Sequence, residues 1–158
     1  MLAEVLAALQ ALPPAGFAAL FAVLGLLIGS FLNVVIYRLP KMMDEAWAIE
    51  AESYRQKDNP DWLPPAPSIT LSSPASTCGH CGHQIRWYEN IPVLSWLFLR
   101  AKCSACHTPI SWRYPLIELA TAALFAYTAW RFGFSWITLA WCAFSSLVMA
   151  LFWIDWDT

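Results

Sequence analysis

Charged residues are scarce in this chain. Only 13% of its 158 residues are Asp, Glu, Lys or Arg, whereas 59% are hydrophobic. This balance excludes an ordinary soluble domain and indicates a membrane protein. The net charge of -2 provides no basic face for a nucleic-acid backbone, so we expect no nucleic-acid partner. The sequence also shows no glycine-rich phosphate loop and no internal repeat.

Three apolar runs could form membrane helices in a lipid bilayer. The first, Gly16 to Tyr37, has no charged residue over 22 positions, enough to cross about 30 Å of hydrocarbon. The residues before it lack the basic start of a secretory signal, so we expect this run to remain as a span. The other runs, Tyr114 to Trp130 and Trp136 to Ile154, are separated only by a tight turn, which predicts a helical hairpin.

Small and polar residues inside the runs predict how the helices pack. Gly25, Gly29 and Asn33 are spaced by four and share one helix face. Small residues on such a face permit close helix packing, with Asn33 as a hydrogen-bond donor to a neighbouring helix. Cys142, alone in the third run, is most simply a packing residue.

Four cysteines lie in two pairs, Cys78 with Cys81 and Cys103 with Cys106, and 21 residues separate the pairs. A two-residue spacer lets a tight turn direct both sulfurs of a pair at one Zn²⁺, so the pairs predict a tetrahedral zinc site. Two disulfides, or reduced structural thiols, are the alternatives. Four cysteines complete such a site, and we therefore do not expect His80, His83 or His107 to be ligands.

The distribution of positive charge predicts the orientation. Eight of the nine lysines and arginines fall between the first and second runs, and Arg38, Lys41 and Arg113 adjoin the runs directly. The positive-inside rule then places residues 41–113 in the cytoplasm and the amino terminus in the periplasm. Cytosolic thiols stay reduced, which favours zinc over disulfides.

The expected fold is an all-α polytopic membrane protein with a cytoplasmic four-cysteine zinc-binding loop domain. Residues 1–40 hold the amino-terminal segment and first span, 41–113 the loop, and 114–158 the hairpin. Within the loop, residues 41–67 begin as a helix-compatible segment and end at Asn59-Pro60 and a proline cluster, and residues 68–113 form the zinc module. The stretch Ile91 to Leu99 is too apolar for a solvated loop, so we expect it on the membrane surface or against the spans.

Four motifs together resemble bacterial type IV prepilin peptidases and cover most of the chain in the family's order. They are GSFLNVVIYRLP at Gly29 to Pro40, ENIPVLSWLFLRAKC at Glu89 to Cys103, ISWRYPLIELATA at Ile110 to Ala122, and the terminal FWIDWDT. The resemblance implies an inner-membrane aspartyl endopeptidase. Such enzymes remove the basic leader from prepilins or type II secretion pseudopilins, and N-methylate the new amino terminus with S-adenosylmethionine as methyl donor.

The resemblance also implies the catalytic residues. Asp155 matches the first aspartate of the family's Ile-Asp-x-Asp pattern and is the preferred catalytic residue, with Asp157 as the second candidate. An aspartyl protease needs two facing carboxylates, and positions two apart on one helix project to nearly opposite sides. The family's second aspartate belongs to a Gly-x-Gly-Asp motif that these 158 residues lack. We therefore expect the chain to be a fragment that does not cleave prepilin.

Two positions leave functional questions open. Ala101 stands where the family commonly has glycine, and alanine restricts positive φ, which puts methyl transfer in question. Glu118 lies inside the second run, where a carboxylate costs about 2.5–3.5 kcal/mol at a span centre. It either forms a structural pair, for instance with Arg113, or acts near the substrate or methyl donor. A noncatalytic zinc-ribbon adaptor and a thiol-redox membrane protein remain alternatives to the enzyme.

Overall fold

The computed structural model describes residues 1, 4 and 12–157. Most of the amino-terminal segment expected before the first span thus lies outside the described residues. The elements are α2 (Pro14–Arg55), the 3-10 helix η1 (Trp87–Asn90), α3 (Leu94–Phe98), α4 (Arg113–Phe132) and α5 (Trp136–Asp157). Across the described residues no strand forms, only two isolated antiparallel bridges, so the mainly helical character that the sequence predicts is confirmed.

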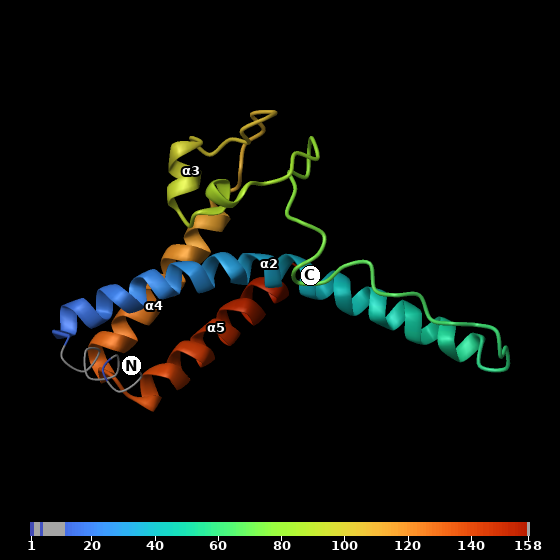
Figure 1. The fold of residues 1–158 in the computed structure, drawn as a ribbon, viewed down its shortest axis with the longest axis horizontal. Helices are drawn as coiled ribbons and strands as arrows, with labels where there is room; N and C mark the ends of the chain where they lie inside the picture. Colours follow the sequence, from blue (N-terminus) through green and yellow to red (C-terminus); the bar gives the residue numbers. More distant parts are fainter. Residues whose placement is uncertain (2–3, 5–11, 158) are drawn as a thin grey trace.

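The first apolar run and the beginning of the loop form one helix. α2 continues for 42 residues, so the boundary expected at residue 40 falls inside it. Pro40 lies within the helix, and Figure 1 shows that α2 changes direction near its middle. Proline removes a backbone donor and pushes against the preceding turn, which accounts for a bend without a break. The segment after the bend is helical, as its composition predicted.

Three helices pack into a bundle in which α4 contacts both α2 and α5 (Figure 1). Two of the helices in the described part of the chain, α2 and α5, are long and apolar enough to cross a membrane. α4 occupies the place of the expected second span. Gly133, with φ of 60°, ends α4, and α5 begins at Trp136, so the predicted hairpin is confirmed.

Close helix packing of α2 on α4 depends on the glycines at four-residue spacing. A Cβ atom on Gly25 would lie 2.6 Å from Ala122 Cα, and one on Gly29 would lie 2.7 Å from Glu118 Cα. Asn33 Nδ2 donates to the carbonyl oxygen of Tyr114 at 3.2 Å. The predicted small-residue face and interhelical hydrogen bond are both confirmed.

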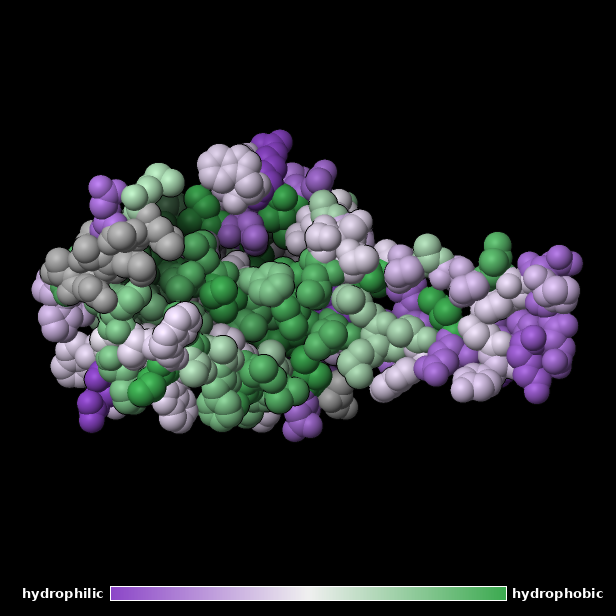
Figure 2. All heavy atoms as spheres, turned by 60° about the horizontal axis from the view of Figure 1, so that its bottom comes forward, coloured by the Kyte–Doolittle hydropathy of each residue, from purple (hydrophilic) through white to green (hydrophobic). Residues whose placement is uncertain are grey.

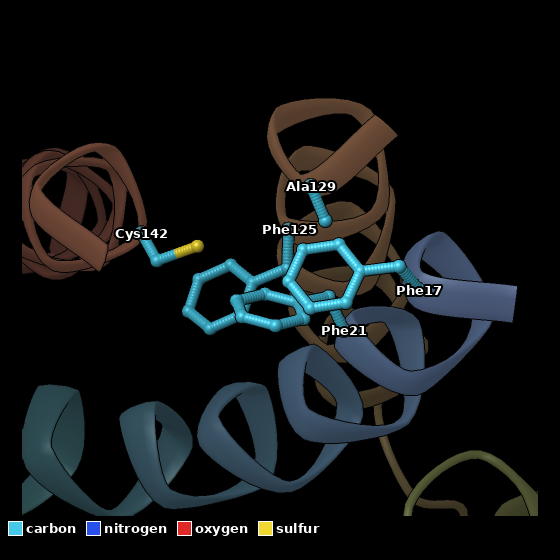
Figure 3. Close-up of a cluster of buried hydrophobic side chains, with 5 residues drawn as sticks. All are labelled: Phe17, Phe21, Phe125, Ala129 and Cys142. Carbon is cyan, nitrogen blue, oxygen red and sulfur yellow. The ribbon is translucent and has the colours of Figure 1, made fainter. Parts of the chain in front are cut away.

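Aromatic side chains fill the bundle near the beginning of α2. Figure 3 shows Phe17 and Phe21 of α2 meeting Phe125 and Ala129 of α4, with Cys142 of α5 pointing toward them. All five side chains are buried, and the packing role predicted for Cys142 is confirmed. A second cluster of Leu32, Ile36 and Ile117 lies nearer the far end of α5.

The part of α2 beyond the bend extends away from the bundle as an arm, with the chain returning alongside it (Figure 1). The returning segment is attached to α2 at two points. Arg38 donates to the carbonyl oxygens of Thr70 and Pro74 at 2.8 and 2.6 Å, and the Glu45 carboxylate accepts the backbone N–H of Ser68 at 2.8 Å. Figure 2 shows a broad hydrophobic surface over the bundle and a more hydrophilic one on the arm.

Candidate metal centre and carboxylate site

Each cysteine pair is built on a tight turn closed by two backbone hydrogen bonds. In the first turn, the Cys78 N–H donates to the carbonyl of His83 at 2.8 Å and the Gly82 N–H donates to the carbonyl of Cys78 at 2.9 Å. Gly82 has φ of 73°, a conformation that glycine adopts at no steric cost. This turn directs the two sulfurs of the pair to the same side.

The second turn repeats the first with an offset of 25 residues. The Cys103 N–H donates to the carbonyl of Thr108 at 2.9 Å, and the His107 N–H donates to the carbonyl of Cys103 at 3.0 Å. His107 occupies the position of Gly82 and also has positive φ, 57°. The bridge between Lys102 and Pro109 likewise repeats the one between Thr77 and Gln84. The two cysteine turns are therefore a structural duplication, although the sequence shows no evident repeat.

The sequence pattern that the two turns share is short. Both turns read Cys-x-x-Cys-x-x-x-Ile, with the isoleucines at Ile85 and Ile110. The Ile85 N–H donates to the carbonyl of Ser76 at 2.8 Å, and the Ile110 N–H donates to the carbonyl of Ala101 at 2.6 Å. Because only three of eight positions are shared, the repeat is not evident from residue identity alone.

The two turns bring all four cysteine sulfurs together. Their Sγ atoms all lie within 4.8 Å of one another, and those of Cys78 and Cys106 are 3.8 Å apart. A tetrahedral zinc–thiolate site with Zn–S distances of about 2.3 Å has sulfurs about 3.8 Å apart. All five cysteines of the chain are free thiols. The residues predicted as metal ligands thus form a cluster that could hold a metal ion.

The thiols of this cluster have widely separated pKa values. A hydrogen bond with the Thr108 hydroxyl, aided by its backbone N–H, lowers the pKa of Cys106 to about 5. The backbone N–H of His83 lowers the pKa of Cys81, but hydrogen bonding with Cys106 and burial outweigh it and raise that pKa to about 11. Thiolates packed this closely repel one another, so a bound cation is what allows all four to ionise together.

Hydrogen bonds from His83 and Glu89 connect the two turns. His83 Nε2 lies 3.2 Å from Glu89 Oε2 and 3.2 Å from Ser104 Oγ. The Glu89 carboxylate also accepts the Arg86 N–H at 2.8 Å. This bond, together with the hydrogen bonds to Ser104 and His83, lowers the pKa of Glu89 from 4.5 to about 2. His83 therefore links the turns through its side chain and lies outside the cluster of possible ligands.

The module is joined to the bundle through Glu118. Its carboxylate is buried, with 7% of the residue exposed, and accepts the backbone N–H of Val93 at 2.7 Å. The pairing with Arg113 that the sequence suggested is wrong, because Arg113 binds Asp157 instead. Val93 could not be predicted as the partner, because almost every residue type carries the same backbone N–H donor.

The two carboxylates at the end of α5 are both exposed. The Arg113 guanidinium holds Asp157 through two contacts of 2.7 and 2.6 Å, and its Cζ lies 4.7 Å from the centre of the Trp153 ring. This bidentate clamp fixes the last turn of α5 against the first turn of α4. Asp155 is exposed in the same turn of α5. The beginning of α4 and the end of α5 therefore lie together at the open end of the hairpin.

Ala101 has a positive φ, the conformation that glycine adopts without steric cost. Its φ is 58°, and Arg100 before it has φ of 52°. Two consecutive non-glycine residues in the left-handed region are unusual and strained. The Ala101 N–H nevertheless donates to the carbonyl of Trp96 at 2.8 Å, which fixes the turn that leads into the second cysteine pair.

Comparisons with known proteins agree with this geometry. The chain is 49% identical over 147 residues to a prepilin leader peptidase/N-methyltransferase of Stutzerimonas stutzeri, covering 91% of this chain and 49% of that protein. It is 48% identical over 139 residues to the protein of the same name from Neisseria gonorrhoeae, covering 88% and 48%. The corresponding Pseudomonas aeruginosa protein is 50% identical over 123 residues, covering 78% and 41%.

The chain spans about half the length of these relatives or less. No solved structure matches it. The model of the family described as the Bacterial Peptidase A24 N-terminal domain matches residues 23–132, which include α4, the cysteine cluster and most of α2. The chain therefore belongs to the bacterial peptidase A24 N-terminal domain family.

Proposed function

We propose that this chain is part of a membrane aspartyl endopeptidase that removes the basic leader from type IV prepilins or type II secretion pseudopilins. The proposal also includes N-methylation of the new amino terminus with S-adenosylmethionine as methyl donor. The observation that carries it is the 48–50% identity to proteins named prepilin leader peptidase/N-methyltransferase. The two apolar helices support a location in the bacterial inner membrane.

Asp155 is proposed as one carboxylate of a catalytic pair whose partner lies outside residues 1–158. In such a pair one carboxylate activates water and the other, protonated, polarises the scissile carbonyl. Asp155 is the better candidate because it matches the first aspartate of the family's Ile-Asp-x-Asp pattern, and Asp157 is bound by Arg113. Asp157 and Arg113 would then hold the end of α5 in place while Asp155 reaches the substrate.

The cysteine cluster is proposed to bind one structural Zn²⁺. Four thiolates complete a tetrahedral site and leave no open position for water or substrate, so the ion would stabilise the loop and take no part in peptide hydrolysis. We place the loop in the cytoplasm, where the basic leader of a prepilin is also found. The support is the positive charge of Arg38, Lys41 and Arg113 beside the spans.

Asparagine substitution at each aspartate of α5 tests the catalytic assignment. In the full-length protein, Asp155→Asn should abolish prepilin cleavage while zinc content and membrane insertion stay unchanged. Asp157→Asn is the matched control, because it is the same change two residues away, and it should lower stability and leave cleavage measurable. The assignment is reversed if only Asp157→Asn abolishes cleavage. Full cleavage by both variants would contradict the aspartyl mechanism.

A further inference from the structure

We propose that residues 91–98 form a short segment inserted into the membrane interface, with Leu94, Leu97 and Phe98 in contact with lipid. Their partner is the bilayer that holds α2 and α5, so the inference rests on the membrane location proposed above. It assigns a membrane contact to a part of the cysteine-containing loop itself.

The exposed side of α3 is wholly apolar. Leu94, Leu97 and Phe98 are 51%, 57% and 82% exposed, and residues at this spacing share one helix face. Trp96 lies on the other side, where its Nε1 donates to the carbonyl of Ile110 at 3.2 Å. One face of the helix therefore contacts the zinc module, and large apolar side chains point outward from the other. Exposure of these side chains to water is unfavourable.

The attachment of Val93 to Glu118 sets the depth of this segment. Glu118 is five residues beyond Arg113 along α4, a rise of about 7–8 Å. Arg113 and its partner Asp157 mark the polar end of the bundle. Because the Val93 N–H lies 2.7 Å from the Glu118 carboxylate, α3 begins within about 8 Å of that level. Interfacial helices bury their apolar faces about 5–10 Å into the headgroup and acyl boundary.

The segment also adjoins the apolar side of α2. A hollow of about 250 Å³ between them is lined by Leu27, Ser30, Phe31 and Val34 of α2 and by Asn90 and Pro92 of the loop. Leu27 and Phe31 are 56% and 48% exposed on a helix apolar enough to span a membrane. The residues that lead into α3 thus adjoin a surface that lipid covers if α2 crosses the bilayer.

Positive charge follows the apolar face directly. Arg100 and Lys102 are exposed immediately after α3, where their long side chains can reach lipid headgroups. Figure 1 shows α3 beside the beginning of α4, with the two cysteine turns extending further from the bundle. This order, from apolar face to basic residues to polar metal module, matches the order of regions from the hydrocarbon core to the cytoplasm.

Site-directed spin labelling of the full-length, zinc-loaded protein tests the proposal. A nitroxide attached to p-acetylphenylalanine avoids the cysteines and is introduced singly at Leu97, Leu27 or Leu63. Leu63 is the matched aqueous control, because it is a leucine 83% exposed in the segment that returns along the arm, and Leu27 is the control within α2. Collisions with molecular oxygen report lipid, and collisions with a water-soluble nickel complex report water, in nanodiscs of phosphatidylcholine and phosphatidylglycerol.

We expect the oxygen-to-nickel collision ratio at Leu97 to be several-fold higher than at Leu63 and lower than at Leu27. A ratio at Leu97 equal to that at Leu63, with Leu27 in lipid, overturns the inference and leaves the proposed membrane enzyme intact. Water accessibility at Leu27 as well would overturn both. Low collision rates of Leu97 with both reagents would show that protein covers the face, and that result also overturns the inference.

A second variant tests whether Glu118 sets the depth. Glu118→Ala removes the acceptor for the Val93 N–H, so the label at Leu97 should move toward water while bound zinc, measured by metal analysis, is retained. Glu118→Gln keeps an acceptor oxygen and should retain most of the depth. Unchanged accessibility at Leu97 in Glu118→Ala, with zinc retained, would show that this contact does not hold α3 in the membrane.

Discussion

Replacing Gly25 by alanine tests the close packing of α2 on α4. The added Cβ would lie 2.6 Å from Ala122 Cα and 2.9 Å from the carbonyl oxygen of Thr121, both backbone atoms that cannot rotate away. Ordinary carbon contacts are about 3.5–4.0 Å, so the two helices must separate locally by about 1 Å. Gly29→Ala meets the same obstacle at Glu118 Cα, 2.7 Å away.

The magnitude follows from two opposing effects. Overpacking typically costs about 1–3 kcal/mol, and alanine is about 1 kcal/mol better than glycine inside a helix in water. We therefore expect each substitution to lower the free energy of unfolding by up to about 2 kcal/mol. Gly16→Ala is the control, since it lies in the same helix and its Cβ would meet Pro13 Cγ at an ordinary 3.4 Å. It should be neutral or slightly stabilising.

Steric trapping in lipid bicelles measures these free energies of unfolding. Hydrogen exchange adds a local readout, because the clash at Gly29 falls on Glu118 and should increase exchange of the Val93 amide that Glu118 accepts. Gly25→Ala should affect that amide less, since its clash lies one turn further along α4. If Gly25→Ala and Gly29→Ala are as stable as Gly16→Ala, the tight contact between α2 and α4 is wrong.

Three further predictions concern the loop. Purified protein should contain one zinc ion per chain. In the Cys103→Ser variant this ion should be absent and hydrogen exchange should increase across residues 76–110, while α2 and α5 stay protected. Ala101→Gly should stabilise the loop by about 1 kcal/mol by relieving the positive φ, seen as a higher melting temperature, and Ala101→Val should lower it. The backbone N–H of Ser68 donates to Glu45 and lowers the pKa of that carboxyl below 4.5. The ionised carboxylate therefore stabilises the fold fully above pH 4.5, and this stabilisation is lost as the pH falls through the lowered pKa. Exchange of the Ser68 amide, corrected for intrinsic rate, should rise in that window and should already be high at neutral pH in Glu45→Ala, which removes the acceptor.

The sequence by itself determined the features that depend on residue type and spacing. Four cysteines in two short turns can converge on one cation whatever the path between them, and the glycines at positions 25 and 29 share a face in any helix. A charge-free run of 22 residues is stable as a helix in lipid because its backbone groups must bond internally. The family resemblance follows from the same residues.

Only the tertiary structure decided which groups meet across the chain. Glu118 could have paired with Arg113 by sequence, but its partner is a backbone N–H, which any residue at position 93 other than proline would supply. The sequence also left open how far α2 continues beyond Pro40. A proline destabilises a helix but does not always end it, and here Arg38 and Glu45 of α2 bind the returning chain. Pairings between distant segments depend on three-dimensional packing. The type of a residue indicates only that a buried polar group needs a hydrogen-bond partner, and not which group supplies it.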